Sequence, residues 1–380
     1  MMGDSLLEVS NLHVEFATEE GVAEVLNGVD LSIDPGETLA LVGETGCGKS
    51  VTAKAILGLL SEPPARIPAG EIRYKGQDLL DLSPAQRHQK RGREMSMIMQ
   101  DPMTSLNPVL TVGDQMMDVL KWQGKTRLGA TEWLRDKLSS DADYRDQAIE
   151  MLAEVQISAP DRVFSSYPVE LSGGMRQRVL IAIAMLLEPE FLVADEPGTA
   201  LDVTTEDKIL DLLEALSAEH DTSVLYITHD LGIAKKVSDH VRVMYAGEIV
   251  ESAPTEVLLS RPQHPYTRGL LDSIPRLSSG IGAGIPGELP DYTDPPAACR
   301  FADRCPHAEA TCTEVFPYAR YVERDHAVAC HLHDGEPVHA RHVDTAGAGA
   351  YIGPAPWATE SEGSPAGETP VDGSATGGDQ

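Results

Sequence analysis

GETGCGKS, from Gly43 to Ser50, is the stretch of sequence that decides the fold. It matches G-x-x-x-x-G-K-[ST] and lies between an apolar run, residues 38–42, and a helix-like segment, residues 51–60. In that context the backbone N–H groups of the loop and the start of the helix are expected to bind phosphates. Lys49 can then reach the β- and γ-phosphates of a nucleotide, and the Ser50 hydroxyl can bind Mg²⁺. The predicted nucleotide-binding residues here are Gly43, Glu44, Thr45, Gly46, Cys47, Gly48, Lys49, Ser50 and Val51.

Further motifs follow in a fixed order, and together they argue against a chance glycine-rich turn. An apolar strand, FLVADEP at residues 191–197, ends in the paired carboxylates Asp195 and Glu196. A second apolar strand, VLYITHD at residues 224–230, ends in His229. Phosphoryl transfer to water needs a fixed Mg²⁺ and an aligned water, so we expect Asp195 to bind the metal and Glu196 to act as general base. The remaining motifs are MSMIMQDP with Gln100, LSGGMRQR at residues 171–178 and TALD at residues 199–202.

With these motifs the chain resembles the ATP-binding subunits of ABC transporters over residues 5–255. LSGG is the motif that best distinguishes this family from other NTPases, because many NTPases share a phosphate loop and an acidic strand end. Strands that alternate with helices predict an α/β fold with a mainly parallel sheet. The resemblance implies an ABC-type P-loop NTPase domain with an N-terminal antiparallel β subdomain and an inserted helical subdomain at about 102–178. Within that subdomain the polar residues 121–146 are expected to form a surface insertion.

The resemblance also implies roles for individual residues. Gln100 is expected at the Mg²⁺, His229 at the γ-phosphate and the attacking water, and Phe16 against adenine, although a core aromatic is nearly as good a reading of Phe16. The signature motif is expected to bind the γ-phosphate of a nucleotide on a neighbouring subunit, with Asp202 along the same interface. Met175 and Gly198 depart from the residues common at those positions. The signature residues are Leu171, Ser172, Gly173, Gly174 and Met175.

Past residue 255 the sequence contains four clustered cysteines, with spacing C-x5-C-x6-C-x17-C. In a cytosolic chain such a cluster favours a metal site over disulfides. Four thiolates suit a [4Fe–4S] cluster, with zinc or no metal as alternatives, whereas Cys47 in the loop is expected to be passive. HPYTRGLL, IPGELP, RFADRCPHA and AVACH resemble the C-terminal extension of oligopeptide and dipeptide permease ATP-binding subunits, expected here at residues 256–335. The candidate ligands are Cys299, Cys305, Cys312 and Cys330.

Composition narrows the function further. The 380 residues include 60 acidic and 30 basic side chains, a net charge of −30, which disfavours nucleic-acid binding. The basic cluster at residues 87–93 is expected to be a solvated helix face. No apolar run approaches the roughly 18 residues that span a bilayer, and no secretory signal is visible. We therefore expect a peripheral protein on the cytoplasmic face of the membrane, a high-salt cytoplasm, and a disordered acidic tail over residues 336–380.

These observations predict the ATP-hydrolysing subunit of an importer for dipeptides or oligopeptides, with ATP and Mg²⁺ as cofactors. The expected partners are two membrane-spanning subunits, a second ATP-binding subunit that is homologous but distinct, and an extracellular solute-binding protein. Nickel or oligosaccharides are alternative solutes. A soluble ABC-type ATPase of DNA repair or translation, an iron–sulfur scaffold with a vestigial ATP site, and an exporter are less well supported, because their expected features are missing from the sequence.

Overall fold

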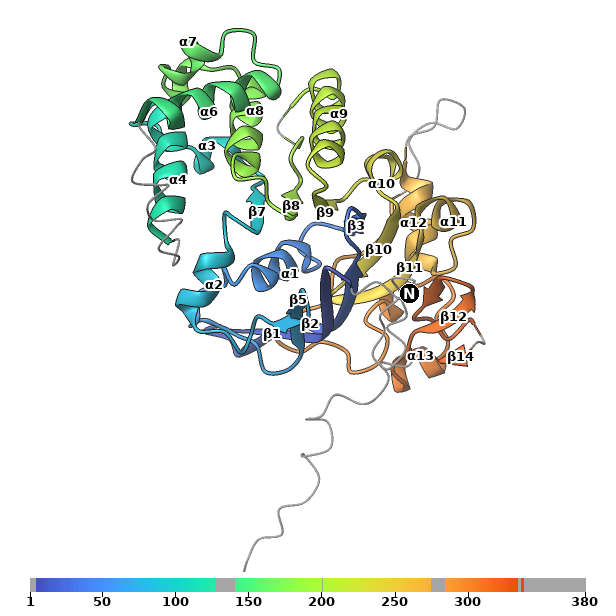
Figure 1. Ribbon diagram of the computed structural model, residues 1–380. Coiled ribbons are helices and arrows are strands. Elements are labelled where there is room, and N and C mark those ends of the chain that lie inside the picture. The colour runs from blue at the N-terminus through green and yellow to red at the C-terminus, as the bar shows by residue number, and fades with distance from the viewer. Residues whose placement is uncertain (1–4, 127–140, 200, 275–283, 334–335, 338–380) are drawn as a thin grey trace, which may run out of the picture.

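The computed structural model describes residues 5–126, 141–199, 201–274, 284–333 and 336–337 (Figure 1). The middle of the predicted insertion and nearly all of the predicted tail lie outside these ranges. The described part contains two sheets, and the smaller one is antiparallel, as the sequence predicts for the N-terminal region. Its strands follow the order β2-β1-β5-β6, with β4 also paired to β1. They are β1 (Leu7–Ala17), β2 (Val22–Ile33), β4 (Ala65–Arg66), β5 (Glu71–Tyr74) and β6 (Gln77–Asp78).

The larger sheet carries the parallel strands. Its order is β14-β12-β13-β11-β10-β3-β9-β8-β7, and the run from β10 to β7 is parallel throughout. Strands in such a run are covered on both faces, which explains why β3, β8 and β9 are almost continuously apolar and buried. The parallel strands are β3 (Thr38–Val42), β7 (Met95–Ile98), β8 (Phe191–Asp195), β9 (Ser223–Thr228) and β10 (His240–Tyr245).

The outermost antiparallel strands of this sheet come from the chain after residue 255. β10 and β11 form a hairpin, and β13 then pairs with β11, so the extension continues the sheet of the nucleotide-binding part. β12 pairs with β13 and with β14, which places residues 336–337 in a strand, although the sequence starts the predicted tail at about 336. These strands are β11 (Glu248–Pro254), β12 (Arg320–Glu323), β13 (His326–Val328) and β14 (Glu336–Pro337).

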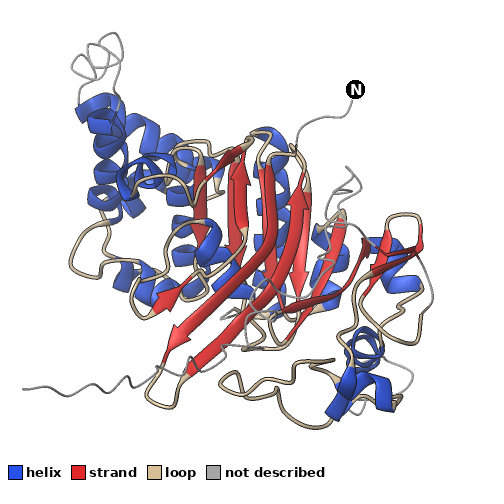
Figure 2. Ribbon diagram, turned by 90° about the horizontal axis from the view of Figure 1, so that it is seen from below, coloured by secondary structure: helices blue, strands red, loops and turns tan. Residues whose placement is uncertain are grey.

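Alternate residues of the parallel strands face two separate cores. On β8, Phe191 and Val193 pack into the core between the two sheets, which also receives α1. Leu192 and Ala194 point to the opposite face, where α8 and α9 cover the sheet. This alternation is the two-residue period of a strand, and Figure 2 shows helices lying along the larger sheet. The helices next to the sheets are α1 (Lys49–Ile56), α2 (Pro84–Lys90), α8 (Gly173–Met185), α9 (Val203–Glu219), α10 (Leu231–Val237), α11 (Thr255–Ser260) and α12 (Pro265–Ser273).

A helical lobe is inserted between β7 and β8, close to the predicted range of 102–178 (Figure 1). Leu120, Ala148, Leu152 and Val163 from three of its helices share a core with α8. None of the helices in the described ranges combines the length and apolarity needed to cross a bilayer. The lobe contains α3 (Pro102–Ser105), α4 (Val112–Thr126), α6 (Asp141–Glu154), α7 (Pro160–Phe164) and the 3₁₀ turn η1 (Pro168–Glu170), and the extension adds η2 (Ala302–Arg304) and α13 (Ala310–Glu314).

Candidate functional site

Four neighbouring parallel strands bring the predicted catalytic groups to one edge of the larger sheet. The phosphate loop, residues 43–50, follows β3, and Gln100 follows β7. Glu196 comes directly after β8, and His229 directly after β9. Because β7, β8, β9 and β3 lie side by side, their carboxyl ends meet at the same edge, where α/β proteins bind their ligands.

Two glycines of the phosphate loop stand where a side chain has no room. A Cβ at Gly43 would lie 2.2 Å from the carbonyl oxygen of Met244. Gly48 has φ of 113° at the start of α1, and a Cβ there would lie 2.7 Å from Leu26. The loop can therefore close tightly against the neighbouring strands only with glycine at these positions. Thr45 and Gly46 lie on its exposed side.

Lys49 and Ser50 lie at the start of α1, facing the loop and the carboxylates. The Lys49 ammonium is buried and donates hydrogen bonds to the carbonyl oxygens of Gly43, at 2.7 Å, and Glu44, at 3.0 Å. The Ser50 hydroxyl donates to Asp195 Oδ1 at 3.2 Å. Burial raises the pKa of Asp195 above its ordinary value, and the Ser50 hydrogen bond opposes that rise. A cation at this edge would favour the ionised form of the carboxylate.

Three side chains fix the Glu196 carboxylate. Gln100 Nε2 and the Thr199 hydroxyl each donate to Glu196 Oε2 at 3.0 Å, and His229 Nδ1 lies 3.1 Å from Oε1. Glu196 itself has φ of 46°, a left-handed conformation that is uncommon outside glycine. Its side chain is consequently held in a single direction at the strand end.

The Glu196–His229 contact shifts both pKa values in the sense expected of an ion pair. The hydrogen bond from His229 lowers the pKa of Glu196 below 4.5, against an opposing effect of burial. The same hydrogen bond raises the pKa of His229 above 6.5, again against burial. Glu196 is therefore ionised near neutral pH, which is the state that can accept a proton.

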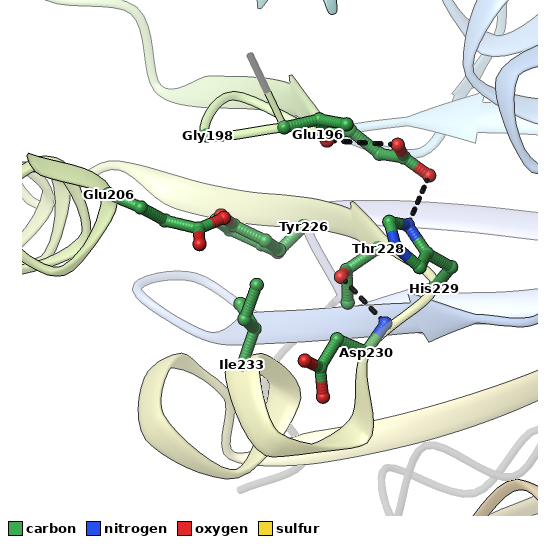
Figure 3. A pocket seen from close by; sticks show the side chains of 9 residues that line it. Glu196, Gly198, Glu206, Tyr226, Thr228, His229, Asp230 and Ile233 are labelled. Carbon is green, nitrogen blue, oxygen red and sulfur yellow. Dashed lines mark hydrogen bonds and ion pairs between the residues drawn. The ribbon is translucent and has the colours of Figure 1, made fainter. Parts of the chain in front are cut away.

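A pocket of about 160 Å³ opens beside this pair (Figure 3). In Figure 3 Glu196 and His229 point toward each other on one side, and Glu206 and Tyr226 lie on the other. Burial raises the pKa of Glu206, and the nearby Asp230 carboxylate adds to the rise. The pocket is therefore polar and adjacent to the predicted base. Its lining residues are Glu196, Gly198, Thr199, Glu206, Tyr226, Thr228, His229, Asp230 and Ile233.

The signature motif forms the start of α8, away from the phosphate loop of its own chain (Figure 1). Ser172 caps this helix and accepts a hydrogen bond from the Met175 N–H at 3.3 Å. Ser172 and Gly173 are exposed, whereas Leu171 is buried and Met175 packs against the core of the helical lobe. An exposed serine and glycine at a helix start can present N–H groups to an anion outside the chain. Met175 thus has a packing role in this core.

The predicted interface residue Asp202 caps the next helix. Its carboxylate accepts hydrogen bonds from the backbone N–H and the hydroxyl of Thr205, which lower its pKa. Nearby, a Cβ at Gly198 would lie 2.5 Å from Glu206 Oε1. Glycine at position 198 therefore leaves space for the Glu206 side chain, which is a local reason for this departure from the common residue.

Two further predicted residues are placed by the structure without a contact that tests their role. Phe16 lies on β1, half-buried, opposite Ala23 on β2 and Ala65 on β4. Cys47 is fully buried, and burial raises the pKa of its thiol to about 11. A buried, protonated thiol is unreactive, in line with the expected passive role.

The four cysteines of the extension have free thiols and form no disulfides. The Cys299 N–H donates to the Cys312 carbonyl oxygen at 3.1 Å. Neighbouring thiols contribute to raising the pKa values of Cys299, Cys305 and Cys330, after the larger effect of burial. The thiols are thus within electrostatic range of one another. Within the described ranges, however, no three His, Cys, Asp or Glu side chains form a group that could hold a metal ion.

Each of these sulfurs accepts a backbone N–H. The donors to Cys305 and Cys312 lie at 3.4 Å and 3.5 Å. Backbone N–H groups also lower the pKa values of Cys299 and Cys330, opposing burial. Such hydrogen bonds stabilise thiolates and tune metal clusters that thiolates hold. The donors are Phe301, His307, Glu309 and Leu332.

Several residues that touch the site were not among the residues predicted from the sequence. Thr199 belongs to the TALD motif, and its hydroxyl also donates a hydrogen bond to Glu196. Tyr266, Tyr292 and Arg304 of the extension contact the phosphate loop. Tyr266 lies within HPYTRGLL and Arg304 within RFADRCPHA, so the motifs were visible although their contact with the loop was not.

The chain matches two protein families. Residues 26–199 match the ABC transporter family, and residues 250–312 match the C-terminal region of oligopeptide/dipeptide transporters. It is 44% identical to the dipeptide transport ATP-binding protein DppD of Bacillus subtilis (strain 168) over 89% of this chain and 97% of that protein. It is 46% identical to the oligopeptide transport ATP-binding protein OppD of the same organism, over 80% of this chain and 82% of that protein.

A solved structure gives the same fold. The ATP-binding cassette MJ0796, in a dimeric post-hydrolysis state bound to ADP and Pi, matches with a TM-score of 0.56 at 26% identity. The match covers 66% of this chain and 98% of that one. It supports the P-loop NTPase fold that the motifs predict. The chain therefore belongs to the family of ABC transporter ATP-binding subunits with an oligopeptide/dipeptide C-terminal region, and it is an ATPase.

Proposed function

We propose that this chain hydrolyses ATP to energise the import of dipeptides or oligopeptides. The observation that carries the proposal is the convergence of the phosphate loop, the Ser50–Asp195 pair and the Glu196–His229 pair at one sheet edge. The identity to peptide-transport ATP-binding proteins over most of the chain supports the solute class. Nickel and oligosaccharides remain the alternative solutes for the same ATPase.

Ser50 and Asp195 fit a magnesium ion. Their oxygens lie 3.2 Å apart, and two adjacent ligands of an octahedral Mg²⁺, each about 2.1 Å from the metal, lie about 3 Å apart. We propose that these residues, with Gln100, hold the ion on the nucleotide. Bound there, Mg²⁺ supplies positive charge that offsets the charge developing on the phosphates.

The protein's own groups would then align and deprotonate water. Lys49 and the loop N–H groups neutralise and fix the γ-phosphate. Glu196 Oε1 or Oε2 takes the proton as the water oxygen bonds to the γ-phosphorus, and the bond from phosphorus to the β–γ bridging oxygen breaks to release ADP. Gln100, Thr199 and His229 hold the carboxylate in place for this transfer.

Completion of the site needs a second subunit in this proposal. Ser172, Gly173 and Gly174 at the exposed start of α8 would bind the γ-phosphate held by a neighbouring cassette, with Asp202 along the contact. The dimeric state of MJ0796 supports this arrangement. ATP would then join two cassettes, and hydrolysis would release them.

The further proposed partners are two membrane-spanning subunits, a homologous second ATP-binding subunit, and an external solute-binding protein. Purification of the chain from membranes, followed by mass spectrometry of the accompanying proteins and of the ligand on any binding protein, tests this. Peptides on the binding protein are expected. Nickel or an oligosaccharide on the binding protein would identify that ligand, and not peptides, as the transported solute. Accompanying DNA-repair or ribosomal proteins would contradict the transport role.

We further propose that Cys299, Cys305, Cys312 and Cys330 hold a [4Fe–4S] cluster, with zinc as the alternative. The electrostatic effect of these thiols on one another and their backbone N–H donors support this proposal. Such a cluster would cross-link the extension and so stabilise its fold.

Protein purified without oxygen is accordingly expected to be brown, with broad visible absorption and bound iron and sulfide. Cys305→Ser should lose the colour because a ligand is removed, whereas Cys47→Ala should keep it. Absorption spectra and metal analysis check this result. Colourless protein with zinc would favour the alternative, and colourless protein without metal would contradict both.

The acidic composition leads to a proposal about salt. A net charge of −30 destabilises a folded chain by self-repulsion unless salt screens it. Thermal unfolding is therefore expected at a higher temperature in molar KCl than in dilute buffer. Molar sucrose, which is uncharged, is the control for general solute effects. Equal unfolding temperatures in KCl and dilute buffer would remove the case for a high-salt cytoplasm.

A further inference from the structure

The C-terminal extension contacts the phosphate loop at three points. Arg304 donates two hydrogen bonds to the Glu44 carboxylate, at 2.8 Å and 3.0 Å. The Glu44 backbone N–H donates to the Tyr266 hydroxyl at 2.9 Å, and the Tyr292 hydroxyl donates to the Gly46 carbonyl oxygen at 2.9 Å. All three contacting side chains lie outside residues 26–199, the part that matches the ABC transporter family. The loop is therefore braced by residues that the core ATPase family does not supply.

Arg304 is built into its position. Its side chain is only 6% exposed, its Nε donates to the Pro286 carbonyl oxygen at 2.9 Å, and an Nη donates to that of Ile285 at 3.1 Å. The guanidinium also lies over the Tyr245 ring, 5.6 Å from its centre. Gly287 has φ of 87°, and a Cβ there would come within 3.1 Å of Arg304 Cγ. A planar fork with all these partners is specific to arginine, because lysine lacks it.

Glu44 connects the contacts of Arg304 and Tyr266 to Lys49, the lysine proposed to bind phosphate. Its carboxylate binds Arg304, its N–H binds Tyr266, and its carbonyl oxygen accepts a hydrogen bond from Lys49 at 3.0 Å. An unpaired carboxylate at the second position of a loop that receives a triphosphate would repel the ligand. Arg304 offsets that charge while it fixes the loop.

The position of Arg304 depends in turn on the cysteine-containing segment. η2 lies between Cys299 and Cys305, with Ala302 N–H bonded to the Cys299 carbonyl oxygen and Cys305 N–H bonded to that of Ala302. Phe301 anchors this turn against the rings of Tyr245 and Tyr266. The fold of the segment therefore sets where the guanidinium meets the loop.

We propose that Arg304 is a positioning residue of the ATP site, through which the C-terminal extension sets the affinity for nucleotide. The proposal rests on the proposed ATPase function and adds a positioning contact from the extension to the same site. A positioning role differs from a purely structural role in its expected result. Loss of Arg304 and loss of the Glu44 charge should change the affinity for ATP in opposite directions.

Arg304→Gln is expected to raise the KM for ATP by about tenfold, with kcat changed by less than about threefold, because an unpaired Glu44 then faces the triphosphate. Glu44→Gln should instead lower the KM by about threefold, because it removes the negative charge. The double variant should recover most of the affinity. Steady-state ATPase assays and titration with a fluorescent ATP analogue measure these changes. Arg261→Gln, which breaks an exposed ion pair with Glu323 on the same extension, is the matched control.

Different results would contradict the proposed ATPase function and the positioning role of Arg304. Wild-type protein that neither binds nor hydrolyses ATP would contradict the proposed function. Active wild-type protein with an unchanged KM in folded Arg304→Gln, or with equal losses in both single variants, would overturn the positioning role. If Arg304→Gln does not fold, Arg304→Lys replaces it, and a rise in KM of about threefold, with rescue by Glu44→Gln, is expected.

Discussion

Replacement of Glu196 by Gln is expected to lower the turnover of ATP by about a thousandfold while ATP binding is retained. The amide has the shape of the carboxylate but cannot accept the proton of the attacking water. Lys49, Ser50 and Asp195 are unchanged in this variant, so the contacts proposed for the nucleotide remain. Single-turnover hydrolysis and ATP titration measure the two properties separately.

Glu190→Gln is the matched control for this prediction. Glu190 directly precedes β8, at the opposite end of the strand from Glu196, and pairs with Lys75 at the surface. Its replacement should leave turnover within about twofold of wild type, since exposed ion pairs contribute little. Hydrolysis at the normal rate by Glu196→Gln would show that another group activates the water.

Removal of the imidazole by His229→Ala is expected to lower turnover by about a hundredfold and to move the acid limb of the pH–rate profile to higher pH. The His229 hydrogen bond lowers the pKa of Glu196, whereas burial raises it. Loss of His229 removes the largest contribution that lowers the pKa of Glu196, so Glu196 is protonated, and inactive as a base, at a higher pH than in wild type. Profiles of kcat/KM against pH measure the shift.

Two variants control this result. His229→Gln retains a hydrogen-bond donor and should keep the acid limb closer to that of wild type. His220→Ala breaks another His–Glu pair, in which His220 Nε2 lies 2.7 Å from Glu154, and should not move it. An acid limb at the same pH in His229→Ala and wild type would exclude His229 as the group that tunes Glu196.

The pair also makes a pH-dependent contribution to stability with a defined window. The Glu196 part is present above the ordinary pKa of 4.5 and is lost as the pH falls through the lowered value. The His229 part is present below the ordinary pKa of 6.5 and is lost as the pH rises through the raised value. The full contribution therefore lies between pH 4.5 and 6.5. His229 is half exposed, so solvent screening keeps the effect small.

Local motifs allowed the central part of the fold and site to be predicted. The phosphate loop, the acidic end of β8 and the end of β9 each join an apolar strand to chemical groups within a few residues, and parallel strands must bring such ends together. The hairpin from β10 to β11 is equally local. A shared sheet edge for these groups was therefore predictable, whereas the strand order β3-β9-β8-β7 was not, because it differs from the order along the chain.

Contacts between distant residues could not be predicted in this way. Arg304 and Glu44 are 260 positions apart, and nothing in either motif identifies the other as its partner. Gly198 was recognisable as unusual, but its reason is the space taken by Glu206, a side chain on the following helix. The pairing of β13 with β11 likewise joins two short strands across a long loop-rich segment.

That pairing has a consequence for how the domain can be shortened. Cutting the chain after Pro254 would strip β11 of its outer neighbour and leave an open edge strand, which invites association between molecules. It would also remove His326, whose Nε2 lies 2.8 Å from the fully buried Glu251 carboxylate. The Glu251 charge would then lack this partner in the interior. The nucleotide-binding part of this protein is thus not a detachable module, because β13 of the extension completes the pairing at the edge of its sheet.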